Sequence, residues 1–489
     1  MGQIPQNVSI NCPLEICPCQ STRTLFVEAF LQNNRLDHVS QVMGYHPSYL
    51  DNFLKTQNFI LRGDGPLPYD YRHYIAIMAA GRHQCSYLIQ LQKQEFLVQG
   101  GDQSWLKGLH CIPQKLRNLY DINKILAHRP WLLNKSHIEK LTKGKDSWSL
   151  AEVVHAIVIL THFHSLCSFV FPCGVNQELD QAGGYRYPET LQMLNNPGGN
   201  SVAAATGVSK KSSDPKDIPI PNDTRPTAGK ILNGGRLNNF INKIGVADWT
   251  SGRTQNQSPP SPTEPEVGIS TLMQRMKTLS EQTQECTPVE LAKRFENVET
   301  QSAELGAVGP EPQGTPADIG IFIEDTQFIY QDFAKRDEHQ SIPTFRVQDY
   351  SWDDHAYSLV NRLYNDVGNL LDDKFKTAYN LTYYTMGGRT DVDTSRFRRA
   401  IWNYIQCLLG IRHDDYDYGE INQLLEKSLK TFIKSACCYP ECVTKKDYLK
   451  VLREFKHSEK VHVNLMVLEA RMQAELLYAL RTVNRYMTN

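Results

Sequence analysis

With 489 residues the chain is too long for a single hydrophobic core, so we expect at least two domains. Its 52 Lys and Arg residues nearly balance its 53 Asp and Glu residues, and this neutral balance excludes the basic footprint of a nucleic-acid-binding protein. The twelve cysteines form neither a disulfide framework nor complete zinc-ligand pairs, a pattern typical of free thiols in a reducing compartment.

The chain begins with a tail and a helical domain. Residues 1–21 lack the basic start and apolar run of a signal peptide, so we expect a flexible N-terminal tail. Residues 22–175 show helical periodicity almost throughout and no alternating pattern of a sheet, which predicts an N-terminal helical domain. The longest apolar runs, around Val153–Leu160, are far shorter than a bilayer span, so we expect no membrane insertion.

Two long helices are expected in this domain. Asp70–Val98 has the periodicity of one continuous helix. Ser149–Phe171 predicts a second, because Ser149 and Glu152 have the spacing of a capping box. Between these two, Pro130 predicts a sharp break, since proline disfavours a helical conformation in the residue before it.

A long polar segment, residues 176–317, separates the two halves of the chain. Fourteen of the 25 prolines fall between Gly174 and Pro316, among Ser, Thr, Asn, Gly and Gln. Such a segment buries too little apolar surface to offset its chain entropy, which predicts a disordered linker. Two pieces within it, Ile269–Leu279 and Pro288–Val298, have helical periodicity.

The C-terminal domain, residues 318–489, is organised around the stretch 379–420. Gly387 and Gly388 are expected to end a helix, because glycine adopts left-handed conformations without strain. Thr394 stands where the N-cap of the next helix belongs.

The two halves of the chain contain similar sequence segments. Segments 72–83 and 398–413 are both apolar helices that end in Gly, Arg and His. The last predicted helix, Val463–Tyr486, carries a regular apolar stripe. The pattern favours an all-α fold in which a duplicated unit packs about a pseudo-dyad.

Four stretches together resemble the sestrin family. They are YRHYIAIMAAGRHQCSYL (71–88), FRVQDYSWDDHAYSLVNRLY (345–364), the stretch 379–420 and FKHSEKVHVNLMVLEARMQAELLYALR (455–481). The resemblance covers roughly 22–175 and 340–488. It implies two AhpD-like helical domains, related by a pseudo-dyad and joined by the linker. It also implies a stress- and nutrient-responsive regulator in the cytoplasm, with the nucleus as a second candidate compartment.

Cys85 is the candidate nucleophile. Its helix resembles that of AhpD-like alkylhydroperoxidases, whose pattern is C-x-x-C-x-x-x-H, but Leu88 and Gln92 stand in place of the second cysteine and the histidine. Sestrins are proposed to relay protons through a tyrosine that matches Tyr87. Gln92 cannot titrate, so the matching base is lost. Arg82 lies nearby and is a candidate to lower the pKa of the thiol.

Two interpretations of Cys85 stay open. It is a buried structural cysteine, which is the commoner state of free Cys, or it reacts slowly with peroxides through a sulfenic acid. His162 and His164 lie close to Cys167, but a His-x-His spacing places the two rings on nearly opposite helical faces. We therefore expect neither a metal site nor a cofactor.

The second half offers the groups that a free amino acid requires. The resemblance implies leucine as the ligand, with Glu459 for its ammonium group and Arg398 for its carboxylate. Thr382, Thr385 and Thr394 lie on both sides of the two glycines and are expected to close over the ligand as a lid.

Each of these residues also has a plain structural interpretation. Glu459 is alternatively a solvated charge before a helix, Thr394 an ordinary N-cap, and Arg398 the partner of Asp393. The sequence also departs from the family. Leu452 replaces a tryptophan that latches the lid, and Phe397 replaces a leucine beside the pocket, so the affinity for leucine stays open.

The resemblance assigns partner contacts to Ser149, Asp414 and Asp415, through which sestrins engage the second GATOR subcomplex of the mTOR pathway. Without it, the acidic pair is read as a solvated loop. We expect a leucine sensor that binds and inhibits this subcomplex until leucine releases it. The alternative function is a cysteine-dependent alkyl hydroperoxide reductase that acts through Cys85.

Overall fold

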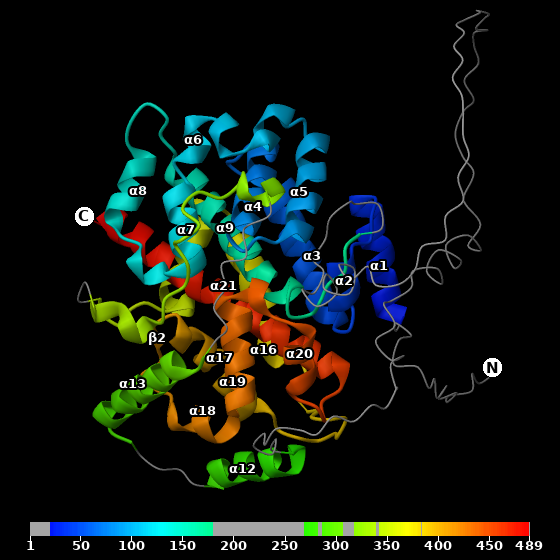
Figure 1. The fold of residues 1–489 in the computed structure, drawn as a ribbon, viewed down its shortest axis with the longest axis vertical. Coiled ribbons are helices and arrows are strands. Elements are labelled where there is room, and N and C mark those ends of the chain that lie inside the picture. The colour runs from blue at the N-terminus through cyan, green and yellow to red at the C-terminus, as the bar shows by residue number, and fades with distance from the viewer. Residues whose placement is uncertain are drawn as a thin grey trace, which may run out of the picture. The chain divides into compact units, whose positions relative to one another are not determined.

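Two long helices lie at the centre of the fold. In the computed structural model α21 (His457–Thr488) packs along α9 (Leu150–Val170), and helices of both halves surround the pair (Figure 1). All described residues belong to one compact unit, residues 18–191 and 265–489. The structure describes residues 20–178, 268–281, 286–306, 317–338, 342–382 and 384–488.

Helix α9 is a core helix. It is long and apolar enough to cross a membrane, but its apolar window lies wholly inside the protein. Every residue from Val153 to Val170 is buried. A helix that is apolar on all sides must be covered on all sides, and α9 is covered chiefly by α4 and α21. We therefore assign it to the core rather than to a bilayer.

The other helices of the first half pack around α9. Short 3₁₀ turns lie at Gln103–Lys107, Leu109–Cys111 and Pro130–Leu132. The helices are α1 (Gln20–Asn33), α2 (His38–Met43), α3 (Pro47–Arg62), α4 (Tyr69–Arg82), α5 (Ser86–Val98), α6 (Gln114–Arg117), α7 (Tyr120–His128) and α8 (Lys135–Thr142).

The predicted continuous helix Asp70–Val98 is wrong, because the chain breaks between α4 and α5. Gln84 adopts a left-handed conformation with φ +52°, and the Cys85 N–H bonds back to the carbonyl of Ala80. The capping box of α9 is confirmed, since Ser149 and Glu152 exchange hydrogen bonds.

The second half contains the remaining elements, with 3₁₀ turns at Phe333–Glu338 and Pro440–Cys442 and a π-helical turn at Trp352–Ala356. Its helices are α12 (Ile269–Glu281), α13 (Pro288–Glu304), α14 (Ala317–Gly320), α15 (Tyr357–Leu363), α16 (Val367–Asn380), α17 (Ser395–Leu408), α18 (Gly419–Leu424), α19 (Lys427–Cys438) and α20 (Lys445–Lys450). Two-residue strands β1 (Phe345–Arg346) and β2 (Ile411–Arg412) pair in parallel.

Helices α12 and α13 confirm the two helical pieces predicted inside the segment 176–317. Both pack on the second half: α12 against α18, and α13 against α17, α18 and α19 (Figure 1). The expected linker is therefore too long at its C-terminal end. Residues 179–267 lie outside the described residues, between the two helical parts.

The predicted duplication is visible in the order of the elements. In the first half α7 ends before a 3₁₀ turn that starts at Pro130, and α8 and α9 follow. In the second half α19 ends before a 3₁₀ turn that starts at Pro440, and α20 and α21 follow. The residues before the two prolines share one conformation, with φ/ψ of −143°/65° at Arg129 and −140°/54° at Tyr439.

A buried ion pair of the second half is contacted by a tyrosine of the first half. Lys374 Nζ of α16 lies 3.0 Å from Glu469 Oε1 of α21, and both side chains are fully buried. Tyr49 of α3 donates a hydrogen bond to the same oxygen. Burial lowers the pKa of Lys374 and raises that of Glu469, and the contact between them opposes both shifts.

Lys374→Ala should therefore destabilise the protein strongly. It leaves the Glu469 carboxylate buried without its cation, a change that costs about 3–5 kcal/mol. Lys376→Ala is the matched control, because Lys376 forms an exposed pair with Asp372 in the same helix and such pairs contribute about 0–1 kcal/mol. Urea unfolding followed by circular dichroism measures both. Equal midpoints for the two variants would contradict this account.

Candidate functional site

Glu459 holds the Gly387–Gly388 turn. It lies in the first turn of α21 and is only 4% exposed. Its carboxylate accepts hydrogen bonds from the backbone N–H groups of Gly387 (2.9 Å), Gly388 (3.2 Å) and Lys456 (2.9 Å). Both glycines have left-handed φ values, +61° and +73°. Glu459 is thus a buried clamp on the turn and not a solvated charge.

Thr382 is fixed by a histidine of α21. His462 Nε2 lies 2.7 Å from the carbonyl of Ala378, which can only accept, so Nε2 carries the proton. The other ring nitrogen, Nδ1, then accepts a 2.6 Å hydrogen bond from the Thr382 hydroxyl. Burial lowers the pKa of His462 to about 3, so the ring is neutral at physiological pH. This histidine was not among the predicted site residues.

Arg398 is buried at the start of α17 and is bonded to the same region. Its Nε donates to the Thr394 hydroxyl (3.1 Å), and Nη1 donates to the Tyr379 carbonyl. The Thr394 hydroxyl in turn donates to the Thr382 carbonyl (3.3 Å). Thr394 therefore precedes α17 without capping it by its side chain.

The structure brings the five predicted residues into one neighbourhood. The Thr385 N–H bonds to the Thr382 carbonyl (3.2 Å), which also accepts from Thr394. Asp393, the alternative partner of Arg398, instead accepts from the Ser395 N–H at 2.9 Å. This bond lowers the pKa of the Asp393 carboxyl.

An apolar cavity of about 160 Å³ lies next to this neighbourhood. Phe397 and Leu452, the two departures from the family pattern, both line it, together with Phe455 of the turn before α21. Helix α12 contributes Ile269 and Leu272 to its lining. None of the five polar residues lines this cavity.

The cysteine of the first half lies at the break between α4 and α5 and not within a continuous helix. Cys85 is fully buried at the N-cap of α5. Arg82 is directed away to the Tyr120 hydroxyl (3.0 Å) and the carbonyl of Phe328 (2.6 Å). The Tyr87 hydroxyl donates to Glu178 at 2.6 Å.

Gln92 is held by a residue that sequence reasoning missed. Its Oε1 accepts a 2.8 Å hydrogen bond from Nδ1 of His73 in α4. Burial lowers the pKa of His73, which favours the neutral ring. His162 and His164 are core histidines, both fully buried. In the part of the chain that the structure describes, no three His, Cys, Asp or Glu side chains are grouped to hold a metal ion.

The predicted partner residues differ in exposure. Asp414 is held by Arg346 and Arg412, each at 2.7 Å. Partial burial opposes its ionisation, but the hydrogen bonds from the two arginines hold the pKa of this carboxyl below its usual value. The Asp415 side chain is 68% exposed and pairs with Arg399 at 3.0 Å. Ser149 is exposed at the N-terminus of α9.

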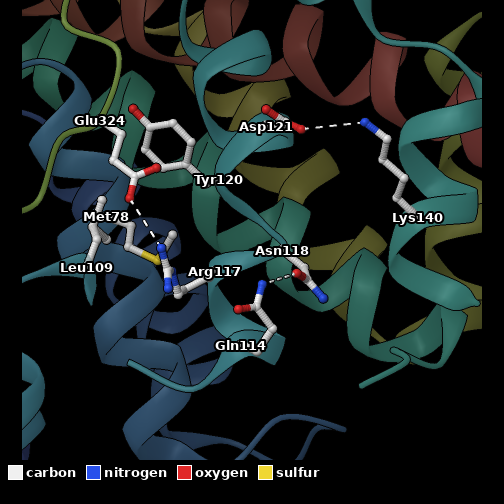
Figure 2. A pocket seen from close by; sticks show the side chains of 9 residues that line it. All are labelled: Met78, Leu109, Gln114, Arg117, Asn118, Tyr120, Asp121, Lys140 and Glu324. Atoms are coloured by element: carbon white, nitrogen blue, oxygen red, sulfur yellow. Dashed lines mark hydrogen bonds and ion pairs between the residues drawn. The ribbon is translucent and has the colours of Figure 1, made fainter. Parts of the chain in front are cut away.

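A second cavity, of about 460 Å³, is lined by residues of the first half and by Glu324 of the second, and by none of the predicted site residues (Figure 2). Ion pairs join Arg117 to Glu324 (3.9 Å) and Lys140 to Asp121 (3.8 Å) at its wall. Its other lining residues are Met78, Leu109, Gln114, Asn118 and Tyr120. Because its charges pair with one another, we assign it no ligand.

Comparison with known proteins decides the family. The family described as PA26 p53-induced protein (sestrin) matches residues 10–487. The chain belongs to the sestrin family. It is 56% identical over 474 residues to a Sestrin homolog of Drosophila melanogaster, with 93% of each chain covered. It is 48% identical to Sestrin-1 of Xenopus laevis (95% of this chain, 88% of the relative) and 46% identical to Sestrin-2 of Homo sapiens (95% and 87%).

Removing the Glu459 clamp should loosen the turn. Glu459→Ala takes away the acceptor of the Gly387 and Gly388 N–H groups, and each such bond contributes about 0.5–1.5 kcal/mol. We expect amide exchange in the peptide spanning the turn to accelerate about tenfold, measured by hydrogen exchange with mass spectrometry.

Glu290→Ala is the control for this experiment. Its carboxylate accepts the Thr287 N–H at 2.8 Å, so its loss should speed exchange at the start of α13 and leave the glycine turn protected. Unchanged exchange at the turn in Glu459→Ala would show that the clamp has no stabilising effect.

Proposed function

We propose that this chain senses free leucine and regulates the second GATOR subcomplex. The leucine-free protein binds and inhibits the subcomplex, which lowers mTOR signalling, and leucine releases it. Membership of the sestrin family supports the proposal. So does the gathering of the five matched positions, Thr382, Thr385, Thr394, Arg398 and Glu459, around one turn.

The observation that carries the proposal is the buried carboxylate of Glu459 beside the glycine turn. A buried carboxylate requires strong donors, and here the hydrogen bonds come from three backbone N–H groups. The ammonium group of an amino acid is a stronger donor for the same oxygens, because it adds a full positive charge.

The other groups match the rest of an amino acid. Arg398 offers a buried planar guanidinium to the ligand's carboxylate. The Thr394 hydroxyl bonds to Arg398 and to the Thr382 carbonyl, and the Thr382 hydroxyl bonds to His462, one turn after Glu459 in α21. Phe397 is buried next to Arg398 in the chain and supplies an apolar wall for the side chain of leucine.

This arrangement links ligand binding to the conformation of the turn. An ammonium group that binds Glu459 competes with the N–H groups of Gly387 and Gly388 for the same two oxygens. Either the turn moves away and loses its hydrogen bonds to Glu459, or it keeps them while the ammonium group binds the same carboxylate. Leucine binding therefore favours one of these two conformations of the turn.

Helix α17 offers a physical route from the leucine site to the partner loop. Arg398 belongs to the leucine site, while the next residue, Arg399, reaches Asp415 at 3.0 Å. A small shift of the first turn of α17 therefore moves both groups. We propose that this shift changes the Asp414–Asp415 surface when leucine binds.

The alternative, an alkyl hydroperoxide reductase at Cys85, has less support as the main function. Arg82 is directed away from the thiol, Tyr87 is bonded to Glu178, and Gln92 offers no base. A dedicated peroxidase requires an accessible activated thiolate, and Cys85 is fully buried.

Leucine binding should depend on both buried charges. Glu459→Ala and Arg398→Ala should each cost on the order of 2–5 kcal/mol of affinity, because each leaves one charge of the ligand buried without its partner. Valine lacks one methylene and should bind about 10–200-fold more weakly than leucine. Isothermal titration calorimetry on the purified full chain measures these affinities.

Arg396→Ala is the matched control, since Arg396 lies in the same turn of α17 but pairs with Glu420. It should bind leucine as the unmodified protein does. The leucine site is in the wrong place if Glu459→Ala and Arg398→Ala also retain full affinity.

The partner surface should be separable from the leucine site. Asp414→Ala combined with Asp415→Ala should retain leucine binding and lose the subcomplex in a pull-down from cell lysate. Asp417→Ala is the control from the same loop, because Asp417 pairs with Arg294 of α13.

Arg399→Gln tests the connection between the leucine site and the partner loop most directly. It keeps both sites but removes the link to Asp415, so leucine should bind without releasing the subcomplex. Normal release by leucine in this variant would exclude the route through α17.

A further inference from the structure

Helix α12 lies on the surface of the second half and is held there by one apolar stripe. Three of its side chains are buried, Ile269, Leu272 and Met276, at the spacing of a single helical face. The outer face carries residues such as Lys277, whose side chain is 79% exposed. The helix packs chiefly on α18, at the periphery of the fold (Figure 1). An element with so few buried side chains opens locally at a low cost in free energy.

The first residue of α12 contacts the glycine turn. Ile269 is 4% exposed, and a Cβ atom on Gly387 would lie 1.9 Å from its Cδ1 atom. Its backbone N–H donates a hydrogen bond to Glu454 (2.9 Å). Ile269 also lines the apolar cavity of about 160 Å³, together with Leu272 and Phe397. One side chain of α12 therefore packs against both the turn and the cavity beside it.

Polar contacts fasten α12 to two segments of the leucine site. Arg389, directly after the glycine turn, donates to the Ser270 hydroxyl (2.9 Å) in the first turn of α12. Arg396, in the first turn of α17, donates to the Ser280 hydroxyl (3.1 Å) in the last turn of α12. The glycine turn and the start of α17 are thus both bonded to the same surface helix.

We propose that α12 is a detachable cover that controls access to the leucine site. The inference rests on the proposed leucine site and names a regulator of it. In the docked state α12 holds the glycine turn in place and closes the apolar cavity. In the released state the turn is freed and the cavity opens to water. A 13-residue helix is marginal in isolation, so α12 unfolds when it leaves, and the cover has two distinct states.

Docking of α12 and binding of leucine should stabilise each other. Leucine bound to Glu459 and Arg398 lies next to the turn that Ile269 holds in place, so release of the turn removes one side of its site. By linkage, the factor by which docking raises the affinity for leucine equals the factor by which leucine favours docking. Release of α12 therefore lowers the affinity for leucine without a change in any of the five site residues.

Met276→Ala tests the cover without changing the site. Met276 is buried under α12 but is not among the residues that line the cavity. Loss of its side chain weakens docking, because the helix loses one of its three apolar anchors. Without leucine, we expect amide exchange of the α12 peptide to accelerate at least about tenfold and exchange of the glycine turn to accelerate with it. Hydrogen exchange with mass spectrometry on the full chain measures both.

Two further variants serve as controls. Met276→Leu keeps the apolar contact and should restore the protection of α12 and of the turn. Lys277→Ala changes the neighbouring residue on the outer face, where Lys277 pairs with Glu281 at 3.9 Å. It should leave exchange at the glycine turn unchanged.

Leucine provides the second arm of the experiment. Its binding to the unmodified protein should slow exchange of the α12 peptide several-fold, as well as exchange of the turn. In Met276→Ala the dissociation rate of radiolabelled leucine and its Kd should both rise several-fold. Lys277→Ala should bind and release leucine as the unmodified protein does.

Three results would overturn the proposal. One is exchange at the glycine turn that keeps its unmodified rate while exchange of α12 accelerates in Met276→Ala. Another is equal exchange of α12 in Met276→Ala and Lys277→Ala, since docking would then not depend on the apolar stripe. The third is an unchanged Kd and dissociation rate of leucine in Met276→Ala. If the unmodified chain binds no leucine, the proposed function is contradicted instead, and the ligand-free exchange alone decides whether α12 controls the turn.

Discussion

A single buried guanidinium connects the two halves of the chain. Arg471 of α21 is 1% exposed, and all five of its N–H groups have acceptors. A buried charge is tolerated only when it is paired and fully hydrogen-bonded, so the surrounding elements cannot shift without large cost. The acceptors come from α21 itself, α9, α19, the end of α4 and α7: Glu475 (2.8 Å), Ser168 (2.7 Å), the Cys437 carbonyl (2.8 Å), His83 Nε2 (2.7 Å) and the Ala127 carbonyl (2.9 Å).

This constraint makes α21 the rigid reference for the candidate site. The helix is fixed in its middle by Arg471 and by the ion pair of Glu469 with Lys374. Its first turns then present Glu459 and His462 at set positions. The glycine turn, in contrast, is held to α21 by a few hydrogen bonds. A rigid helix beside a weakly held turn is the arrangement expected where ligand binding changes conformation.

Much of the fold could be predicted because its signals are local. The capping box at Ser149, the break at Pro130 and the periodicity of α12 and α13 each depend on residues close in sequence. The residue at the break between α4 and α5, Gln84, is neither Gly nor Pro, so its residue type did not indicate the end of a helix. The contact of Gln92 with His73 and that of His164 with Glu475 each join different helices. Sequence periodicity says nothing about such pairs, which depend on packing alone.

The candidate site extends into the segment that composition predicted to be disordered. Ile269 of α12 packs so closely on the glycine turn that a Cβ atom on Gly387 would lie 1.9 Å from its Cδ1. Only glycine fits there, both for this reason and because φ is +61°. Arg389, just after the turn, donates to Ser270 of α12 at 2.9 Å. Any movement of the turn must therefore displace or carry α12. The start of α12 thus forms part of the surroundings of the candidate site, because its residue Ile269 packs against the glycine turn.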